Sequence, residues 1–468
     1  MVPSKAETAG QRQHFLAYSM AVVCKPFRTP QRYKRGGYLL LVLTFLAFCY
    51  HTSCLIQKHQ SSGGMNYFED GGWVPAVSIM KYSTPAAISQ AMCALLFGSS
   101  VMGKTLYVGT GVAEILSYSF DGTSFAPISS TNDSFPSPTW QTFDGDIMYS
   151  VSESGGTTPG AITSYHVENG TFTKISQSAG LPGPVHIALT KNKKGLITAA
   201  YGGQGTNSFV TNNGYLQKNQ QFTYDVSSIV EGRQGESHPH GVFIDPTGAF
   251  AVIPDLGGDV LHVYFIAGSS YTNNMTPLPD VAATVGSGPR HGAFWPNKEG
   301  QKATHFFVVA ELNNEITAYS LTYGTGTLTM TPITTYSTFG SKDKVPVVTG
   351  GPAAGEIAIS SDNKFLYVSN RIDRSFPNVG SSGNGSDSLA QWNIKTDGTL
   401  EFVGLTPAGG LNPRHFSFVT LGGKDYVTVA NPASGDVQLI ERDPVTGKLA
   451  EVSTAFISIP GASAATWN

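Results

Sequence analysis

Charged side chains are scarce in this chain, and so are helical patterns. Charged residues make up only 13% of the 468 residues and hydrophobic residues 40%, while there are 53 glycines. Beyond the N-terminus we find no amphipathic helical pattern of convincing length. These shortages argue against a mainly helical protein. Together with the many glycine, threonine, serine and tyrosine residues, they favour an all-β protein with many tight turns.

Cysteine is also rare, which excludes a fold held together by disulfides. The chain has four cysteines, and three of them, Cys24, Cys49 and Cys54, lie near the N-terminus. Only Cys93 lies at the start of the predicted folded domain. That domain therefore has no internal disulfide framework, whatever its compartment.

Several catalytic and cofactor motifs are absent. The sequence has no G-x-S-x-G, which argues against an esterase with a nucleophile elbow. It has no H-E-x-x-H and no pair of C-x-x-C motifs, so a zinc site is not expected. No G-x-G-x-x-G lies in a βαβ unit, so we predict no nicotinamide cofactor, and no other cofactor is indicated. The Asp and Asn side chains leave a calcium ion in a central channel as an open alternative.

The few charges are unevenly distributed along the chain. Seven basic residues and one acidic residue precede residue 37, so this tail carries +6 and the remainder carries −9 of the total of −3. An acidic main body argues against nucleic acid as a partner.

One long hydrophobic run follows the basic tail. Residues 38–56, YLLLVLTFLAFCYHTSCLI, would span about 28 Å as a helix, which is close to the thickness of a bilayer core. Basic residues on its N-terminal side favour a cytosolic N-terminus. The segment is either an uncleaved transmembrane signal anchor or a signal peptide with a long basic region, while a buried core helix is less consistent with the lopsided charge.

Both favoured interpretations place the rest of the chain outside the cytosol. We therefore expect a single-pass membrane protein with an extracytoplasmic domain, or a secreted protein if the segment is cleaved. Four N-x-S/T sequons follow the hydrophobic run and none precedes it: Asn132, Asn169, Asn274 and Asn384. The predicted organisation is a basic tail at 1–36, a hydrophobic helix at 37–56, a linker at 57–93 and a folded domain at 94–468.

A repeat runs through the folded domain. Seven times a proline opens a short apolar run, at Pro138, Pro184, Pro239, Pro289, Pro352, Pro413 and Pro460. The spacings are 46, 55, 50, 63, 61 and 47 residues. A period of roughly 40–50 residues with short, glycine-punctuated strands is typical of a β-propeller. The count predicts seven blades.

The repeat also predicts how the ring is closed. The seventh first strand, PGASAATWN, lies at the C-terminus, and its matching second strand, TLYVGTG, lies near the start of the domain. One blade would then combine both ends of the domain, which pairs two otherwise open sheet edges.

Two rows of side chains should meet on one face of the predicted disc, because the first strand starts beside the end of the second. The first row follows each proline: Thr139, Val185, His240, Arg290, Ala353, Arg414 and Gly461, with Trp140, His186, His291 and His415 at the next position. The second row ends each second strand: Thr110, Glu153, Tyr201, Asp255, Glu311, Asn370 and Asn431, with Arg371 directly after Asn370. All members of the second row are polar although they follow apolar strands.

This face combines guanidinium, imidazole and carboxylate groups. Three arginines around a channel mouth suit a carboxylate or phosphate ligand, and a Glu or a neutral His can transfer protons. Structural alternatives exist for several residues. Asp255 could accept turn N–H groups, His291 could pack inside the channel, and Arg414 could pair with Glu153 or Asp255. Arg290, Glu311 and His240 are the strongest functional candidates because they occupy equivalent places in neighbouring repeats.

Several of these segments resemble the lactonase family of seven-bladed propellers. They are HPHGVFIDPTGAFAVIPDLGGD, GSGPRHGAFWP, AELNNEITAYS, SSDNKFLYVSNR and NPRHFSF, and the similarity covers about residues 94–468. The family includes propeller-type 6-phosphogluconolactonase and the fungal 3-carboxy-cis,cis-muconate cyclase.

The resemblance implies a lactonase or cyclase site at the channel mouth. It implies catalytic roles for His240, Glu311, Arg290 and Arg371. Around them we expect the side chains of Arg414, His291, His415 and Asp255 to bind substrate. The expected substrate is a small anionic lactone or carboxylate, and the reaction is either hydrolysis or formation of a lactone ring. A non-catalytic extracytoplasmic binding propeller is the alternative, since propellers host many unrelated functions.

Overall fold

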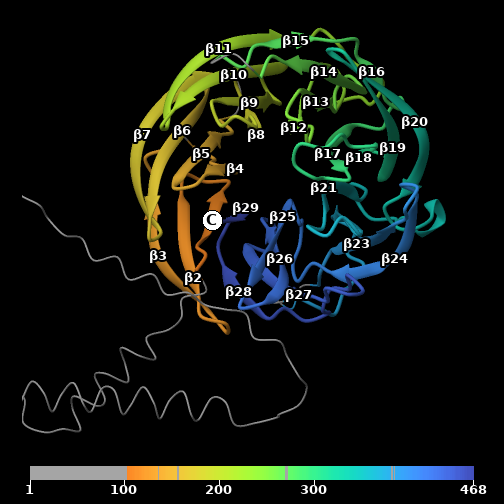
Figure 1. Ribbon diagram of the computed structural model, residues 1–468. Coiled ribbons are helices and arrows are strands. Elements are labelled where there is room, and N and C mark those ends of the chain that lie inside the picture. Colours follow the sequence, from red (N-terminus) through yellow and green to blue (C-terminus); the bar gives the residue numbers. More distant parts are fainter. Residues whose placement is uncertain (1–102, 135, 155–157, 269–271, 381–382, 384) are drawn as a thin grey trace, which may run out of the picture. The chain divides into compact units, whose positions relative to one another are not determined.

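The described part of the chain folds into a ring of seven antiparallel sheets (Figure 1). This computed structural model describes residues 103–134, 136–154, 158–268, 272–380, 383 and 385–468. Within these ranges there are 29 strands and a single short 3-10 helix, η1 (Lys342–Lys344). We count the strands of each blade outward from the centre of the ring.

Blades 1 to 4 contain the following strands. Blade 1 has β29 (Ala462–Trp467), β1 (Leu106–Thr110), β2 (Ile115–Phe120) and β3 (Phe125–Thr131). Blade 2 has β4 (Trp140–Asp144), β5 (Ile147–Ser152), β6 (Gly160–Glu168) and β7 (Thr171–Gly180). Blade 3 has β8 (Pro184–Leu189), β9 (Gly195–Ala200), β10 (Gly205–Asn212) and β11 (Tyr215–Thr223). Blade 4 has β12 (Phe243–Ile244), β13 (Phe250–Asp255), β14 (Val260–Ile266) and β15 (Met275–Pro277), with β16 (Val281–Ala282) also paired to β14.

Blades 5 to 7 follow the same plan. Blade 5 has β17 (Pro289–Trp295), β18 (His305–Ala310), β19 (Glu315–Gly324) and β20 (Thr327–Ser337). Blade 6 has β21 (Ala353–Ile359), β22 (Phe365–Arg371), β23 (Ser388–Ile394) and β24 (Leu400–Pro407). Blade 7 has β25 (His415–Leu421), β26 (Lys424–Asn431), β27 (Asp436–Arg442) and β28 (Ala455–Ser458). The prediction of an all-β, seven-bladed propeller is confirmed.

Blade 1 joins segments from opposite ends of the described chain. The last strand, β29, pairs antiparallel with β1, and Tyr107 lies opposite Thr466 in the register. These are the two segments that the repeat placed in one blade. Any contribution of residues before Gly103 to closing the ring lies outside the described residues, as does the predicted domain boundary at residue 94.

The residue before the repeat proline has a special backbone conformation. In five blades its φ is positive: 60° at Ser137, 59° at Gly183, 65° at Gly288, 72° at Gly351 and 64° at Asn412. Glycine and asparagine adopt this left-handed conformation at the lowest cost, which explains the G-P and N-P pairs of the repeat. The proline then lies at the start of the innermost strand, as Pro184 and Pro289 do, or shortly before it, where a missing N–H is tolerated. Each left-handed residue thus turns the chain into the centre of the ring.

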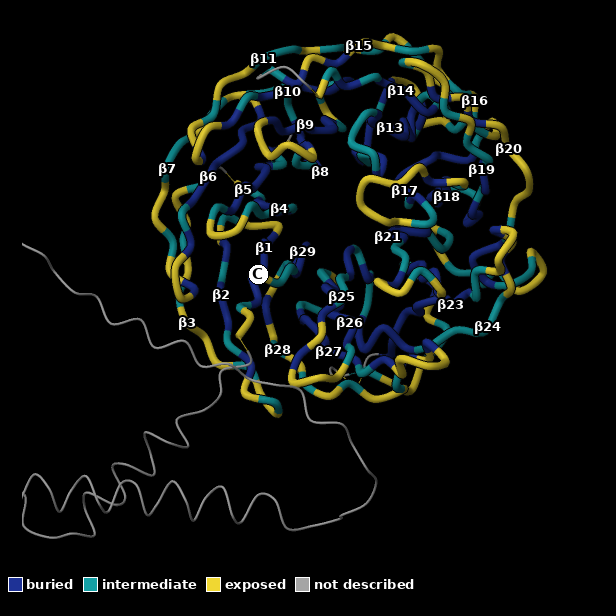
Figure 2. Tube along the Cα trace, in the orientation of Figure 1, coloured by how far each residue is buried: buried dark blue, intermediate teal, exposed yellow. Residues whose placement is uncertain are grey.

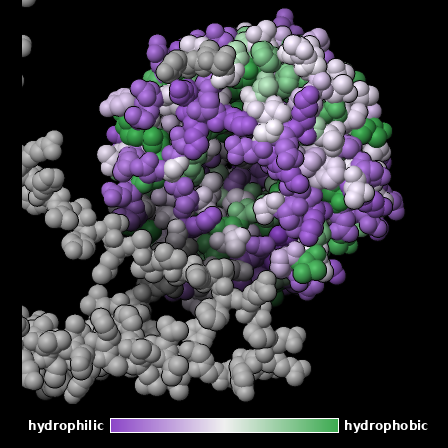
Figure 3. Space-filling view, viewed as in Figure 1, coloured by the Kyte–Doolittle hydropathy of each residue, from purple (hydrophilic) through white to green (hydrophobic). Residues whose placement is uncertain are grey.

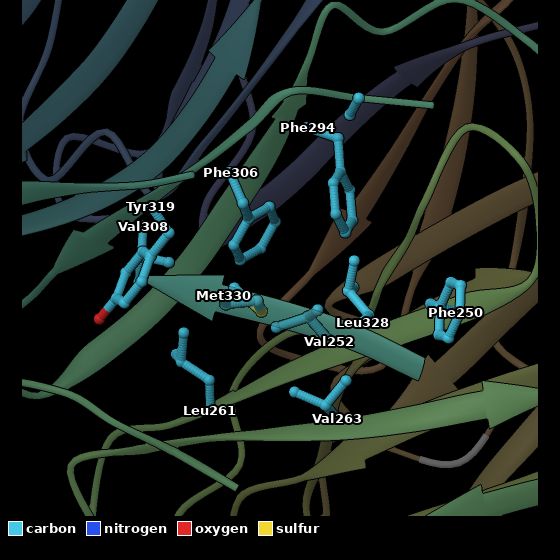
Figure 4. Close-up of a cluster of buried hydrophobic side chains, with 11 residues drawn as sticks. Phe250, Val252, Leu261, Val263, Phe294, Phe306, Val308, Tyr319, Leu328 and Met330 are labelled. Carbon is cyan, nitrogen blue, oxygen red and sulfur yellow. The ribbon is translucent and has the colours of Figure 1, made fainter. Parts of the chain in front are cut away.

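The hydrophobic core lies between neighbouring blades. Figure 4 shows the cluster between blades 4 and 5, where Val252 and Leu261 of blade 4 meet Phe306 and Met330 of blade 5. The outermost strands alternate between exposed and half-buried residues, as β7 does, whereas second strands such as β9 are wholly buried. Figure 2 shows the resulting rim of exposed residues around a buried interior. Packing between blades therefore holds the innermost strands in place.

No helix in the described ranges is long and apolar enough to cross a membrane. The hydrophobic segment at 38–56 and the predicted N-terminal helix lie outside those ranges.

Replacing Gly288 with alanine should destabilise the propeller. Its φ is +65°, and an added Cβ would lie 2.5 Å from the Leu312 side chain. A non-glycine residue held in a strained conformation costs about 1–3 kcal/mol, so we expect a loss of this size in the free energy of unfolding measured with urea. Gly404→Ala is the control, because nothing lies within 4 Å of its Cβ position and its φ is not positive. Equal stability of the two variants would contradict the backbone requirement at Gly288.

Candidate active site

The left-handed residues also fix the ends of the second strands. The backbone N–H groups of Glu153, Tyr201 and Glu311 each donate to the carbonyl oxygen of the left-handed residue in the same blade, at 2.8 Å in all three cases. The start of the innermost strand and the end of the second strand therefore meet on one face in blades 2, 3 and 5. In blade 6 the two strands also meet at this face, because Ala353 at the start of β21 lies opposite Arg371 at the end of β22.

Glu311 lies at the centre of a cluster of three arginines. Its Oε2 atom lies 3.1 Å from Nε of Arg290 and 2.6 Å from Nη2 of Arg371. Its Oε1 atom accepts a hydrogen bond from Nη2 of Arg233. Only 7% of the Glu311 side chain is exposed. One buried carboxylate thus holds three guanidinium groups, two from blades 5 and 6 and one from the loop between blades 3 and 4.

The arginines determine the charge state of Glu311. Burial alone would raise the pKa of Glu311, but Arg371, Arg290 and Arg233 outweigh it and lower the pKa to about 2. Burial and the neighbouring Arg371 lower the pKa of Arg290 to about 9, with Glu311 acting in the opposite direction. At neutral pH both groups are therefore ionised. Glu311 is then a weak base and an anchor for the guanidinium groups.

Backbone carbonyl groups fix two of the arginines further. Arg290 lies in a β-bulge of β17, between the paired residues Pro289 and His291, and its Nη1 donates to the carbonyl oxygen of Gly355 at 2.9 Å. Arg371 donates from Nε to Ala353 and from Nη2 to Ala354, both at 3.1 Å. Bulges often re-aim side chains next to functional sites. Arg290 is buried by its partners, whereas Arg371 keeps 15% of its side chain exposed.

Two histidines and a second buried glutamate form a chain beside this cluster. Nδ1 of His240 lies 3.2 Å from Nε2 of His291, and Nδ1 of His291 lies 3.1 Å from Oε1 of Glu356. Burial is the largest cause that lowers the pKa of both histidines well below its usual value, and Arg290 adds to it. Burial also raises the pKa of Glu356. Both imidazoles are therefore neutral at pH 7, as a proton acceptor must be.

The other predicted histidine, His415, is also buried. His415 packs its ring edge-on against Trp140, with ring centres 4.7 Å apart, and its Nδ1 accepts the backbone N–H of Ala465. His186 also contacts Trp140 and accepts the N–H of Val242 through Nδ1. Burial lowers the pKa of His415 to about 4. The structure thus gives His415 a packing environment, and the predicted contact with substrate is not supported by its position.

Arg414 forms a second ion pair at the mouth. Its Nη2 donates to Oε2 of Glu153 at 2.7 Å, and Thr139 donates to the same oxygen at 2.7 Å. About 20% of the Arg414 side chain is exposed. Its Nε is buried without a hydrogen-bond partner among the described residues. The pairing with Glu153 is one of the structural alternatives that the sequence offered for Arg414. The other N–H groups of its guanidinium can still donate to an anion.

The contacts of Asp255 favour the structural alternative over the predicted contact with substrate. Its carboxylate accepts the backbone N–H groups of His238, Gly257 and Gly258 and lies 3.2 Å from Nε2 of His262. The side chain is fully buried. Asp255 therefore stabilises a turn, which is the structural alternative that the PDLGGD sequence suggested. Asn370 and Asn431 are likewise buried, and each donates a hydrogen bond from its side chain to a neighbouring side chain.

Sequence reasoning missed Arg233 altogether. This residue lies in the loop before β12, outside the repeat, so no alignment of blades could place it at the mouth. It leaves 41% of its side chain exposed while it contacts Glu311. Beside it, His238 stacks on Tyr201 with ring centres 4.0 Å apart. Tyr201 belongs to the second row of the repeat, and its place there was the one sequence signal that pointed to this part of the site.

The mouth is polar and open to solvent at several side chains. Exposed surface remains on Arg233 of the loop before β12, on Arg371 and Arg414 of blades 6 and 7, and on Glu153 of blade 2. Figure 3 shows one face of the disc, on which hydrophilic residues surround a hollow centre. Among the residues that the structure describes, no group of three or more His, Cys, Asp or Glu side chains has a geometry that could hold a metal ion.

Comparison with known proteins agrees with this architecture. The model of the family described as "Lactonase, 7-bladed beta-propeller" matches residues 105–467. The chain belongs to this lactonase family. A relative from Arthroderma benhamiae named "Probable 6-phosphogluconolactonase" is 32% identical over 381 residues, which cover 80% of this chain and 91% of the relative. A 6-phosphogluconolactonase from Formosa agariphila is 28% identical and covers 67% of this chain and 83% of its own length.

A solved structure shows the same fold in this family. The periplasmic gluconolactonase PpgL of Pseudomonas aeruginosa matches with a TM-score of 0.65 and 26% identity, covering 78% of this chain and 98% of that one. The family resemblance that the motifs carried is thereby confirmed. The roles of individual site residues remain predictions that the contacts above support to different degrees.

The buried Glu311 carboxylate should make stability depend on pH in the acid range. Because its pKa falls from 4.5 to about 2 on folding, the gain is present above pH 4.5 and is lost as pH falls towards 2. The shift corresponds to about 3 kcal/mol. We expect Glu311→Gln to lower the free energy of unfolding at pH 7 by a similar amount and to flatten its dependence on pH between 5 and 3. Glu441→Gln, on an exposed pair with Lys424, is the control and should change little. An unchanged pH slope in Glu311→Gln would show that folding does not lower the pKa of Glu311.

Proposed function

We propose that the protein hydrolyses the lactone ring of a small anionic substrate at the channel mouth. The observation that carries this proposal is the arginine cluster held by Glu311 beside the neutral imidazole of His240. Hydrolysis of an ester needs a proton acceptor for water and positive charge for the developing oxyanion. The mouth supplies both within neighbouring blades.

In the proposed reaction His240 acts as the general base. It takes a proton from water while the water oxygen attacks the lactone carbonyl carbon. Arg371 stabilises the negative charge that develops on the carbonyl oxygen. The ring C–O bond then breaks, and the proton on His240 passes to the departing alkoxide oxygen, so one lactone and one water give one hydroxy acid.

Glu311 and Arg290 have a different role from the one that the family resemblance implied. A carboxylate with a pKa of about 2 is a poor base, and it is already bonded to three guanidinium groups. Arg290 is 1% exposed. We therefore assign both as positioning residues that hold Arg371 and Arg233 at the mouth.

Arginines with exposed surface favour an anionic substrate. Arg414 and Arg371 retain exposed guanidinium surface, and arginine binds phosphate and carboxylate groups through paired N–H donors. Relatives named 6-phosphogluconolactonase support a sugar lactone, with or without a phosphate group. The name of the P. aeruginosa neighbour, a periplasmic gluconolactonase, supports the form without phosphate.

Ring formation from a muconate-type acid fits the charge states less well. That reaction adds a proton to carbon, so it needs a proton donor at the mouth. Glu311 is ionised and His240 is neutral at pH 7. We therefore place hydrolysis first. A binding propeller without turnover is the outcome if no lactone or muconate reacts.

His240→Asn should abolish most of the hydrolysis of glucono-δ-lactone or its 6-phosphate. Loss of a general base lowers kcat by about 10²–10⁴-fold. Because the pKa of His240 lies below 6.5, the acid limb of the wild-type profile should fall below that pH. Base consumption at constant pH measures both effects, and Lys424→Ala on the outer surface serves as the control. A wild-type protein that opens neither lactone, or a His240→Asn variant with full activity, would rule out the mechanism.

Arg414→Ala should separate the two lactones. If Arg414 binds the phosphate group, we expect KM for the phosphorylated lactone to rise by about tenfold or more, with little change for glucono-δ-lactone. Equal effects on both substrates would place the anion elsewhere at the mouth.

We further propose that the propeller lies outside the cytosol. The basic tail, the hydrophobic run at 38–56 and the following sequons support this placement. Asn132, Asn169 and Asn274 are exposed on the propeller, as acceptor sites for glycans must be. In a eukaryotic host, we expect glycosidase treatment to reduce the apparent mass, and Asn→Gln changes at all four sequons to remove that shift. A protein of unmodified mass in the cytosolic fraction would contradict the placement.

A further inference from the structure

The carboxylate of Glu356 determines which nitrogen of His291 carries the proton. Oε1 of Glu356 accepts the backbone N–H of Ile357 at 3.0 Å and lies 3.1 Å from Nδ1 of His291. Both oxygens of the ionised Glu356 carboxylate can only accept, and a proton on Oε2 would have no acceptor, because that atom is buried without a hydrogen-bond partner among the described residues. We therefore assign Nδ1 of His291 as the donor to the ionised carboxylate. Since the imidazole is neutral, its Nε2 carries a lone pair.

The same reasoning extends to His240. Nε2 of His291, which carries the lone pair, lies 3.2 Å from Nδ1 of His240. A hydrogen bond at this position requires the proton to be on Nδ1 of His240. Its other nitrogen, Nε2, then carries the lone pair and lies on the side of the ring away from His291. No hydrogen bond to Nε2 of His240 is formed by the described residues.

The two other channel histidines have the opposite arrangement. His186 and His415 accept backbone N–H groups through Nδ1, so their protons lie on Nε2. All four imidazoles are buried in the same channel, and burial is the largest cause lowering the pKa of each. Burial alone therefore does not select the tautomer. The hydrogen-bond partner of each ring selects its tautomer. Only the series of contacts from Glu356 through His291 leaves a lone pair on Nε2 of His240.

The backbone places Glu356 for this task. It lies in a β-bulge of β21, where the register shifts between Ala354 and Ile357, and its backbone N–H donates to the hydroxyl of Ser369 at 2.8 Å. The chain of contacts runs from blade 6 through blade 5 to blade 4. Its charged neighbours are Arg290, Arg371, Arg414 and Glu311, and the arginines disfavour protonation of either imidazole.

We propose that Glu356 and His291 are positioning residues that hold the proton on Nδ1 of His240 and present its Nε2 as the proton acceptor for the reacting water. The catalytic consequence rests on the proposed function, whereas the tautomer itself does not. Neither residue touches the substrate in this scheme. They act through His240, as the third member of a nucleophile–base–orienting group does in other hydrolases.

The test measures the tautomer directly by NMR of the protein labelled with ¹⁵N-histidine. Protonated and unprotonated imidazole nitrogens have well-separated ¹⁵N shifts, and His240→Asn assigns the signals. At pH 7 we expect His240 to carry its proton on Nδ1. His186→Gln is the matched control from the same channel and should leave the His240 signals in that form.

Variants of Glu356 and His291 distinguish a role in orienting the His240 ring from a role in packing alone. In Glu356→Gln the amide oxygen can still accept from His291 and Ile357, so the His240 tautomer should be kept and kcat should stay within a few-fold of wild type. In Glu356→Leu and His291→Phe the acceptor is lost. We then expect a mixture of His240 tautomers and a fall in kcat of about 10²-fold with little change in KM.

Several results would overturn the inference. They are a wild-type His240 protonated on Nε2, a tautomer that Glu356→Leu leaves unchanged, or a Glu356→Gln variant as impaired as Glu356→Leu. If His291→Phe does not fold, the wild-type spectrum and the two Glu356 variants decide the question. If the tautomer is as stated and no lactone is hydrolysed, the proposed function fails and the assignment of the proton positions stands.

Discussion

The candidate site depends on one buried carboxylate. Glu311 pairs with the guanidinium groups of Arg290, Arg371 and Arg233, and without it their positive charges would repel one another with no compensating charge in a largely buried region. Burial by itself opposes the ionised form, so the cluster is stable only when the carboxylate and the arginines are present together. The same interaction ties blades 5 and 6 and the loop before β12 to each other at the mouth. Stability and the geometry of the site therefore share their main electrostatic contact.

Much of the fold could be predicted because each blade repeats a strong local signal. A proline and an apolar run recur in every blade, with a left-handed residue before the proline in five of them, and the second strands are continuous hydrophobic segments. The outermost strands carry no such signal. Strand β7, TFTKISQSAG, alternates between exposed and half-buried positions, and its place depends on packing against its neighbour. Strand β12 contains only Phe243 and Ile244, a reduction that the regular HPHGVFI repeat did not indicate.

The site could be predicted only where the repeat fixed a register. The repeat brought Arg290, Glu311 and Arg371 to one face, and the contacts place them together. It could not give Arg233, which comes from a loop without a counterpart in other blades. It also could not separate Asp255 from Glu311, because both end a second strand with a carboxylate. Their partners decide the difference: turn N–H groups for Asp255 and guanidinium groups for Glu311.

The bond from the left-handed carbonyl to the end of the second strand uses backbone atoms on both sides. The side chain at that position takes no part in this bond. Glu153, Tyr201 and Glu311 occupy three such places with an acid, a phenol and a second acid. The backbone bond at the end of the second strand can therefore stay the same while the recognition group differs from blade to blade. New specificities could arise on this propeller through single substitutions, without remodelling of any loop.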